Sequence, residues 1–294
     1  MKFNQLILAC FIIALVSCTN EDSSKDQSDW LTNMENELAE NPTDEMVEEY
    51  LYILDSLIDT DITNNERNAK LLSRASAFQY NLNKLQSSID LMIRSLKSYP
   101  EVGGFRDNLL TLNELSSKFN KDNKLDSLNK LLISTSFDEE GNRKADVDLS
   151  FYLDDIEATQ QMIYSNSNNP NFKMARRYVQ MVEFFALANP SDTNVPDLLY
   201  EGGKVAELIK NSVKAVELFE WCNKNYGDSE IAPANLFMLA FTCEDGLKDD
   251  AKAATYYKTF MEKYPDHEMY SSAEFLLSNI DKTDEEILNE LRKK

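Results

Sequence analysis

Apolar residues recur every three or four positions along most of the chain, which is the spacing that gathers them on one face of an α-helix. The segment from Asn171 to Asn189 is a clear example, with Ala175, Tyr178, Val179, Val182, Phe185 and Ala186 in helical register. No long stretch alternates apolar and polar residues in the way that a half-buried strand does. The pattern therefore predicts an all-α fold.

The segments with helical periodicity come in pairs, joined by short polar or proline-containing corners. Three predicted pairs are Asp29 to Glu40 with Thr43 to Ile58, Leu109 to Phe119 with Lys124 to Ser134, and Asp148 to Tyr164 with Asn171 to Asn189. Thr43 is the expected N-cap of its helix. The polar stretch from Phe137 to Lys144 is expected to be an exposed loop. Since one helix of a pair cannot bury its apolar face alone, the pairs must stack.

Two segments near the C-terminus repeat one spacing of residue types. Each has an apolar residue at its fourth position, small residues at its eighth and twentieth, and an aromatic residue at its twenty-fourth. In the segment Pro196 to Gly227 these are Leu199, Gly203, Ala215 and Phe219; in Pro233 to Pro265 they are Leu236, Ala240, Ala253 and Tyr257. The second copy has one extra residue near Gly246, and Pro265 turns the chain at its end. A third, weaker copy runs from Ala69 to Pro100.

This spacing resembles the tetratricopeptide repeat (TPR), a helical hairpin of about 34 residues. The resemblance implies a TPR-like α-solenoid of stacked antiparallel hairpins, in which small side chains let the two helices of a hairpin, A and B, approach closely. The segment Glu268 to Ile280 resembles one more helix A. Thr283-Asp-Glu-Glu286 forms a capping box ahead of Ile287, Leu288 and Leu291, which predicts a C-terminal capping helix.

The first residues predict a targeting segment rather than part of the fold. The apolar run from Leu6 to Val16 is shorter than the roughly 20 residues of a membrane-spanning helix, but it suits the core of a signal peptide. Leu15-Val16-Ser17-Cys18 resembles a bacterial lipobox, which implies that Cys18 is lipidated and becomes the first mature residue. An ordinary signal peptide that ends in a cysteine is the alternative.

The segment after Cys18 is expected to be a flexible tether, because residues 19–28 include no large apolar side chain. In bacterial lipoproteins an aspartate directly after the lipidated cysteine often retains the protein at the inner membrane. This chain has Thr19 there, which favours the outer membrane but does not decide between its periplasmic and its surface face. The predicted organisation is a lipoprotein signal peptide (1–17), a tether (18–28), a degenerate helical-repeat region (29–192) that includes the hairpin 69–100, and a tandem TPR region with its capping helix (193–294).

Charge and composition narrow the function classes. Asp and Glu outnumber Lys and Arg by 51 to 30, a formal net charge of -21, which argues against nucleic acid as a partner. A single histidine leaves little room for histidine-based catalysis or zinc binding. The few glycines favour helices joined by short corners. With Cys10 removed and Cys18 lipidated, Cys222 and Cys243 are the two cysteines left with a thiol; they are expected core residues, although a disulfide between them stays open.

No motif predicts catalysis, a metal or a cofactor. Gly202-Gly203 lacks the preceding strand and the further glycines of a phosphate-binding loop, and Gly203 already has a packing role. The acidic clusters lack the spacing of a calcium loop; the segment from Asp138 to Asn142 comes nearest. A hydrolase that uses two of the many carboxylates is the least favoured reading, because nothing singles out a pair.

The resemblance also implies a binding groove. In TPR proteins the second, fifth, ninth, twelfth and thirteenth positions of each helix A line it. Here they are Asp197, Tyr200, Lys204, Glu207 and Leu208 in the first clear repeat, and Ala234, Phe237, Phe241, Glu244 and Asp245 in the second. This aromatic and acidic lining would suit an apolar or basic segment of a partner. Alternatively, the rings pack against neighbouring helices.

Together these features predict a lipid-anchored protein of the bacterial cell envelope that acts as a protein–protein interaction scaffold or adaptor, without catalytic activity. The alternative is a glycan- or nutrient-binding surface lipoprotein with TPR-like helices.

Overall fold

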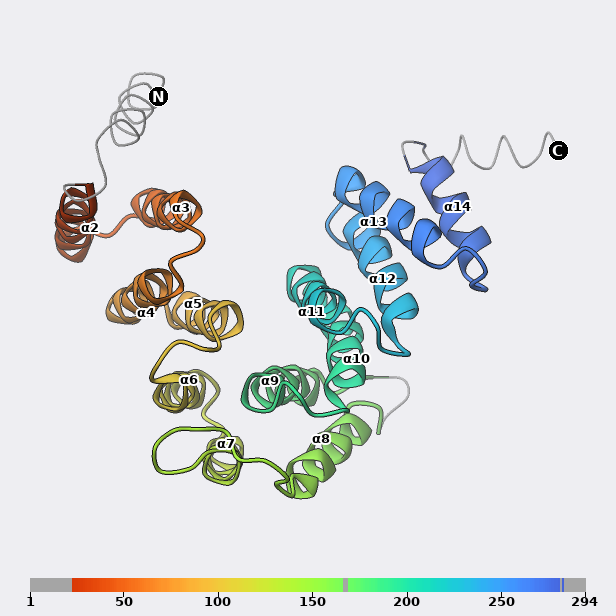
Figure 1. Cartoon of the computed structure of the whole chain (residues 1–294), viewed down its shortest axis with the longest axis horizontal. Helices are drawn as coiled ribbons and strands as arrows, with labels where there is room; N and C mark the ends of the chain where they lie inside the picture. The colour runs from red at the N-terminus through yellow and green to blue at the C-terminus, as the bar shows by residue number, and fades with distance from the viewer. Residues whose placement is uncertain (1–22, 166–168, 281, 283–294) are drawn as a thin grey trace. The chain divides into compact units, whose positions relative to one another are not determined.

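The computed structural model describes residues 23–165, 169–280 and 282, and this part of the chain is all-α (Figure 1). The described residues form thirteen α-helices, one π-helix and no strand; an isolated β-bridge joins Phe137 and Arg143. Within each unit, most helices that follow one another along the chain pack together in a solenoid-like way, so the predicted fold class is confirmed. Among the described helices, none has both the length and the apolar content needed to cross a membrane.

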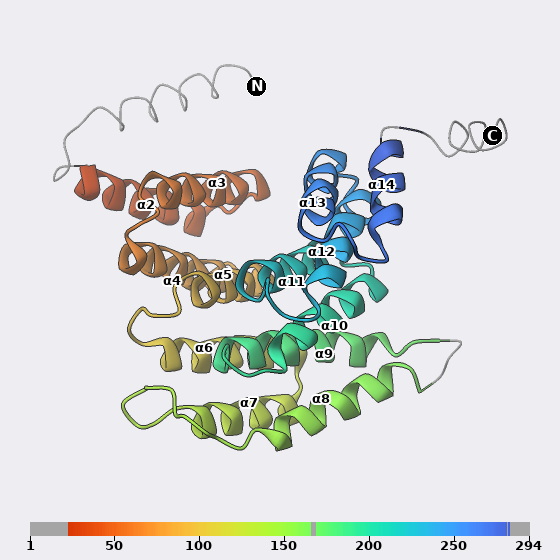
Figure 2. The same cartoon turned by 45° about the vertical axis from the view of Figure 1, so that its right-hand side comes forward.

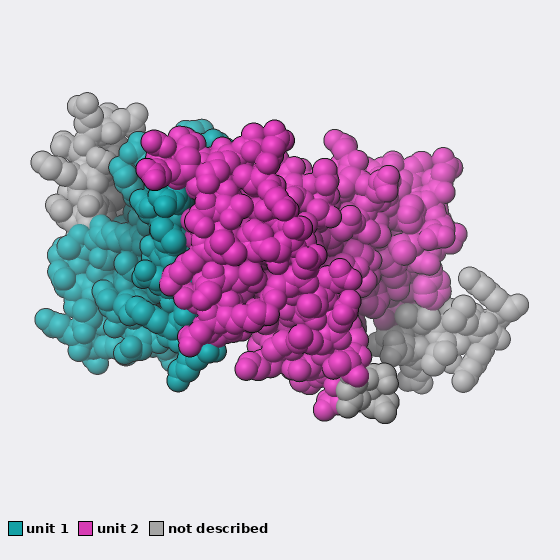
Figure 3. Space-filling model, turned by 90° about the horizontal axis from the view of Figure 1, so that it is seen from below, with its two compact units in different colours: residues 1–121 teal, residues 122–294 magenta. Residues whose placement is uncertain are grey.

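The chain divides into two compact units, coloured separately in Figure 3. Unit 1 (residues 1–121) contains α2 (Ser23–Glu40), α3 (Asp44–Thr60), α4 (Asn65–Asn81), α5 (Leu85–Ser98) and α6 (Phe105–Asn120). Unit 2 (residues 122–294) contains α7 (Asn123–Ser136), α8 (Ser150–Ile163), α9 (Phe172–Ala188), α10 (Val195–Leu208), α11 (Ser212–Asn225), α12 (Ala232–Phe241), η1 (Thr242–Gly246), α13 (Asp250–Lys263) and α14 (Tyr270–Asn279). The boundary predicted at residue 192 separates degenerate from clear repeats, whereas the division at residue 121 separates compact units, so the predicted boundary stays a prediction.

Three hairpins share one way of turning from helix A to helix B: α4–α5, α10–α11, and α12 with η1 and α13. Figure 2 shows α4 beside α5 and α10 leading into α11. In each turn one residue adopts a left-handed backbone, with φ of 58° at Asn83, 60° at Lys210 and 56° at Lys248. The residue that follows is the N-cap of helix B. The predicted hairpins 69–100, 196–227 and 233–265 therefore have a common backbone.

The B helices also end alike. The C-caps of α5, α9, α11 and α13 are Tyr99, Asn189, Tyr226 and Tyr264, with φ of -132°, -134°, -133° and -128°. Each cap donates its amide to the carbonyl four residues earlier. In unit 2 the Tyr226 hydroxyl donates to the carbonyl of Pro190 at 2.7 Å, which ties one inter-hairpin turn to the turn before it.

The contacts between helices A and B follow the positions of the repeat. Gly203 on α10 lies against the ring of Phe219 on α11, so closely that a Cβ at residue 203 would be 2.3 Å from a ring carbon. In α4–α5 the corresponding contact is polar, because the Ser76 hydroxyl donates to the Ser88 carbonyl at 2.7 Å. The residues assigned to repeat packing that are fully buried are Leu199, Ala215, Phe219, Leu236, Ala240, Ala253 and Tyr257, while Pro265 is exposed in a turn.

The extra residue of the second clear repeat is accommodated by a π-helix. η1 continues α12, and the Leu247 amide bonds to the Thr242 carbonyl at 3.0 Å, five residues back. This wider turn brings Gly246 against Ser212, whose hydroxyl oxygen would lie 2.5 Å from a Cβ at residue 246. The insertion near Gly246 thus widens one helical turn and leaves the hairpin intact.

Two expectations differ from the structure. Helix α2 begins at Ser23, inside the segment expected to be a tether, and not at Asp29. The loop 137–144 is also not simply exposed, because Phe137 is 3% exposed and Arg143 donates to the carbonyls of Leu187 and Ala188 at 3.2 and 3.1 Å. These carbonyls lie in the last turn of α9, where no helical amide is left to bond to them, so they need hydrogen-bond donors from outside the helix. Arg143 supplies these donors and thereby holds the loop against α9.

Other predictions fall outside the described residues. These are the signal peptide (1–17), lipidation at Cys18, residues 19–22 of the tether, and the capping helix that begins at Thr283. The predicted N-cap at Thr43 is confirmed, since its hydroxyl accepts the Met46 amide at 3.2 Å.

Candidate functional site

The predicted groove residues of the first clear repeat lie on α10 and are largely accessible. Asp197 and Lys204 are exposed, whereas Tyr200 is half-buried, with its ring centroid 6.1 Å from that of Phe219. The Lys204 ammonium lies 5.1 Å from the Tyr200 ring centroid and 2.8 Å from a carboxylate oxygen of Glu201. Tyr200 is therefore both a packing residue and part of the surface, and Lys204 is already paired.

The second repeat divides the predicted anchors. Phe237 packs into the hairpin, with ring centroids 6.0 Å from Tyr257 and 5.7 Å from Phe260. Phe241, one helical turn later, is 38% exposed. Phe237 therefore follows the alternative in which the ring packs against a neighbouring helix. Among the large apolar side chains of α12, only Phe241 is exposed.

The carboxylates on this face outnumber its cations. Glu244 accepts a hydrogen bond from the Tyr257 hydroxyl at 2.7 Å, and Asp245 pairs with Lys248 at 3.2 Å. Glu207 is partly buried, and its Oε1 atom is shielded from solvent without a hydrogen-bond partner in the described chain. A shielded carboxylate oxygen without a donor is costly to stability.

We give one name, the A-face of unit 2, to the polar and aromatic groove positions that keep accessible surface, leaving out Phe237 because it packs into its hairpin. It consists of Asp197, Tyr200, Lys204, Glu207, Phe241, Glu244 and Asp245 on α10, α12 and η1. Its chemistry suits a segment that brings a positive charge and an apolar side chain. Sequence reasoning found these residues from the repeat register, but it could not separate exposed Phe241 from packed Phe237.

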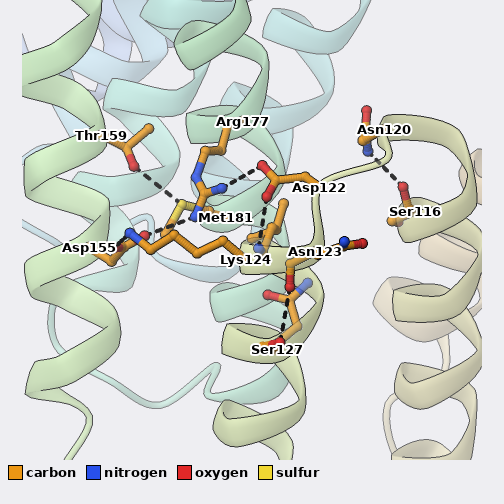
Figure 4. A network of polar contacts seen from close by, with 12 residues as sticks. Ser116, Asn120, Asp122, Asn123, Lys124, Ser127, Asp155, Thr159, Arg177 and Met181 are labelled. Carbon is orange, nitrogen blue, oxygen red and sulfur yellow. Dashed lines mark hydrogen bonds and ion pairs between the residues drawn. The ribbon is translucent and has the colours of Figure 1, made fainter.

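An ion-pair network centred on a shielded arginine lies elsewhere in unit 2 and joins α7, α8 and α9 (Figure 4). The Arg177 side chain is 9% exposed; it pairs with Asp122 and donates to Asp155 at 3.0 Å. Lys124 also bonds to Asp155, at 2.5 Å. This network ties the start of α7 to two other helices, so its role is packing.

The two aspartates of the network are held in the charged form. Burial alone would raise the pKa of Asp122, but hydrogen bonds from the Leu125 amide and Arg177 outweigh it and lower the pKa. Burial likewise opposes ionisation of Asp155, and the bonds from Lys124 and Arg177 again lower the pKa below its usual value.

Both described cysteines are free thiols in the core. Cys222 and Cys243 are each 0% exposed, and they form no disulfide. Burial raises the pKa of the Cys222 thiol to about 12 and that of Cys243 to about 11. Thiols with such pKa values are almost entirely protonated near neutral pH, which makes them poor nucleophiles.

The structure adds a pocket that the sequence did not predict. It has a volume of about 630 Å³ and lies in unit 1, between the first half of α4, the turn after α5, and Asn108 of α6. Lys70 and Ser73 in its wall hold the second and fifth positions of the repeat that starts at Ala69. The repeat register therefore could have marked Lys70 and Ser73 as groove residues, but it does not indicate that the surface around them is concave.

Neither protein-family models nor curated proteins match this chain. Over the described residues, no group of three or more histidine, cysteine, aspartate or glutamate side chains is arranged to hold a metal ion.

Proposed function

We propose that this chain is a lipid-anchored TPR protein of the bacterial cell envelope whose A-face of unit 2 holds a segment of another protein. The lipobox-like Leu15-Val16-Ser17-Cys18 supports the anchor, and the two tandem matches to the TPR spacing support the family. The proposal gives the molecule a scaffolding or adaptor role in which binding, and not catalysis, is the function.

The observation that carries the proposal is the exposed ring of Phe241, with the carboxylates of Glu244 and Asp245 three and four residues further along the chain, in η1. Phe241 is 38% exposed, whereas the neighbouring aromatic residues on α12 and α13 pack against one another. Aromatic side chains are frequent anchors of protein interfaces, and opposite charges around them direct the partner's orientation. A partner segment with a basic residue next to an apolar one fits both features.

Photo-crosslinking in intact cells tests the proposal. A photoreactive phenylalanine analogue at residue 241 should give one dominant protein adduct. The same analogue at Val213, which is 59% exposed on α11 of the same unit, should give little of that adduct. Equal adducts at both positions, or none at residue 241, would refute a binding role for the A-face.

A charge variant sharpens the test. Reversing Asp197 to lysine adds a positive charge to the A-face at an exposed position that has no packing role. The adduct at residue 241 should then weaken, because a basic partner is repelled. An Asp228→Lys variant serves as the matched control, since Asp228 is also exposed in unit 2 but lies in an inter-hairpin turn.

A further inference from the structure

The pocket of unit 1 has an unusual lining for a protein-binding cavity. Its volume of about 630 Å³ is in the range of small-ligand sites, which are commonly about 300–1,000 Å³. The apolar residues that line it are Ala69, Tyr99, Pro100 and Val102, without a leucine, isoleucine, methionine or phenylalanine. An apolar anchor residue of a protein partner would gain little contact there.

Neutral polar side chains supply much of the remaining surface. Asn65, Ser73 and Asn108 all line the pocket, and within the described chain their side chains make no hydrogen bond. An asparagine amide offers two donors and an acceptor, and a serine hydroxyl can donate or accept. These three groups can therefore satisfy a ligand that both donates and accepts at several neighbouring atoms.

The charges around the pocket favour an uncharged ligand. Lys70, the one cation of the lining, pairs with Glu66 at 2.6 Å. Glu101 remains as an additional carboxylate in the wall. A phosphate or carboxylate ligand would need an unpaired cation, and it would be repelled by this excess of negative charge.

We propose that the pocket bounded by α4, the turn after α5 and α6 binds a neutral saccharide. The hydroxyls of a sugar ring are closely spaced donors and acceptors that match the amides of Asn65 and Asn108 and the hydroxyl of Ser73. The ring's C–H groups can contact the small apolar surface of Tyr99 and Val102. This activity is separate from the protein binding proposed for the A-face of unit 2.

Gly103 offers a way to block the pocket without straining the fold. It lines the pocket, and a Cβ at this position would meet nothing within 4 Å. The backbone of Gly103 does not have a positive φ, so a side chain causes no strain there, unlike at Gly104, whose φ is 80°. A Gly103→Phe change should therefore fill pocket space at little cost in stability.

Titration of the full-length, detergent-solubilised protein with defined oligosaccharides tests the proposal. The probes are neutral oligomers of glucose, xylose, mannose and N-acetylglucosamine. At least one should bind, and Gly103→Phe should abolish its binding. The double change Asn65→Leu and Asn108→Leu should weaken it about tenfold, because two hydrogen-bonding groups are lost. Ala77→Phe, on the exposed side of α4 outside the pocket, should leave binding unchanged.

Three results would overturn the saccharide proposal. One is that no probe binds at millimolar concentration, and another is that the pocket variants bind as well as the parent while retaining its circular dichroism and unfolding midpoint. The third is that a photoreactive analogue at Ser73, in the pocket wall, captures a protein in intact cells, which would make the pocket a protein-binding site. Crosslinking at residue 241 reports on the A-face separately, so the two proposals can fail independently.

Discussion

The close contact between Gly203 and Phe219 predicts an unusual response to a glycine-to-alanine change. In an exposed helix this change stabilises the fold by about 1 kcal/mol, because glycine is the poorer helix former. Here the added Cβ would lie 2.3 Å from the ring of Phe219, whereas ordinary contacts begin near 3.4 Å. The ring or the helix must therefore move by roughly 1 Å, and overpacking of this kind costs about 1–3 kcal/mol.

Phe219 has little freedom to give way, since it is 0% exposed and its ring also contacts Tyr200. We therefore expect Gly203→Ala to lower the free energy of unfolding by about 1 kcal/mol net, and Gly203→Leu by about 3 kcal/mol or more. Gly202→Ala is a graded control, because its Cβ would be 3.1 Å from Val182 and the overlap is smaller. Its effect on stability should be close to zero.

The assay is urea unfolding, followed by circular dichroism and by Trp221 fluorescence in a Trp30→Phe background. A double-mutant cycle identifies the cause. Phe219→Ala alone should lower the free energy of unfolding by about 3–5 kcal/mol. In the Phe219→Ala protein, Gly203→Ala should be stabilising, because the ring that would overlap the added Cβ is no longer there. A Gly203→Ala protein that is about 1 kcal/mol more stable than the parent would refute the packing of the hairpin.

Three further outcomes are expected. Arg177→Met should lower the unfolding free energy by about 3–5 kcal/mol at pH 7, measured by urea unfolding. The pKa values of its partners Asp122 and Asp155 are lowered in the folded state, so the stability that these ion pairs add is present above the ordinary aspartate pKa. The difference in unfolding free energy between parent and variant should therefore shrink below about pH 4. In a Cys18→Ser protein purified after signal removal, Cys222 and Cys243 should react with a thiol reagent at pH 8 only after unfolding, since their pKa values are about 12 and about 11; labelling of the folded protein would contradict their burial. Cys18→Ser should also move the protein from the membrane to the soluble fraction of cell extracts, and retention in the membrane would refute the lipid anchor.

The sequence predicted the hairpins well where small residues recur at fixed positions. Gly203, Ala240 and Ser76 share one place in their hairpins, and all three are buried. Gly203 lies against Phe219 of its helix B, and Ser76 bonds to Ser88 of its own. The repeat spacing encodes this contact directly, because only a small side chain allows the close approach. The extra residue near Gly246 was visible for the same reason, although its accommodation in a π-helix depends on backbone geometry that residue types do not specify.

The sequence was less informative about exposure and about concave surfaces. Phe237 and Phe241 are both aromatic groove positions, and four residues of helix separate a packed ring from an exposed one. The pocket beside Lys70 and Ser73 forms from three separate segments, so no local pattern could indicate it. Arg143 was likewise assigned to an exposed polar stretch, because its acceptors on α9 are more than 40 residues away in sequence.

Hydrogen–deuterium exchange of the full chain, with and without the protein captured at residue 241, tests the binding role of the A-face. The captured protein should slow exchange in α10 (Val195–Leu208), α12 (Ala232–Phe241) and η1 (Thr242–Gly246), with little change in α11 (Ser212–Asn225) and α13 (Asp250–Lys263). Protection confined to the B helices, or to unit 1, would contradict it.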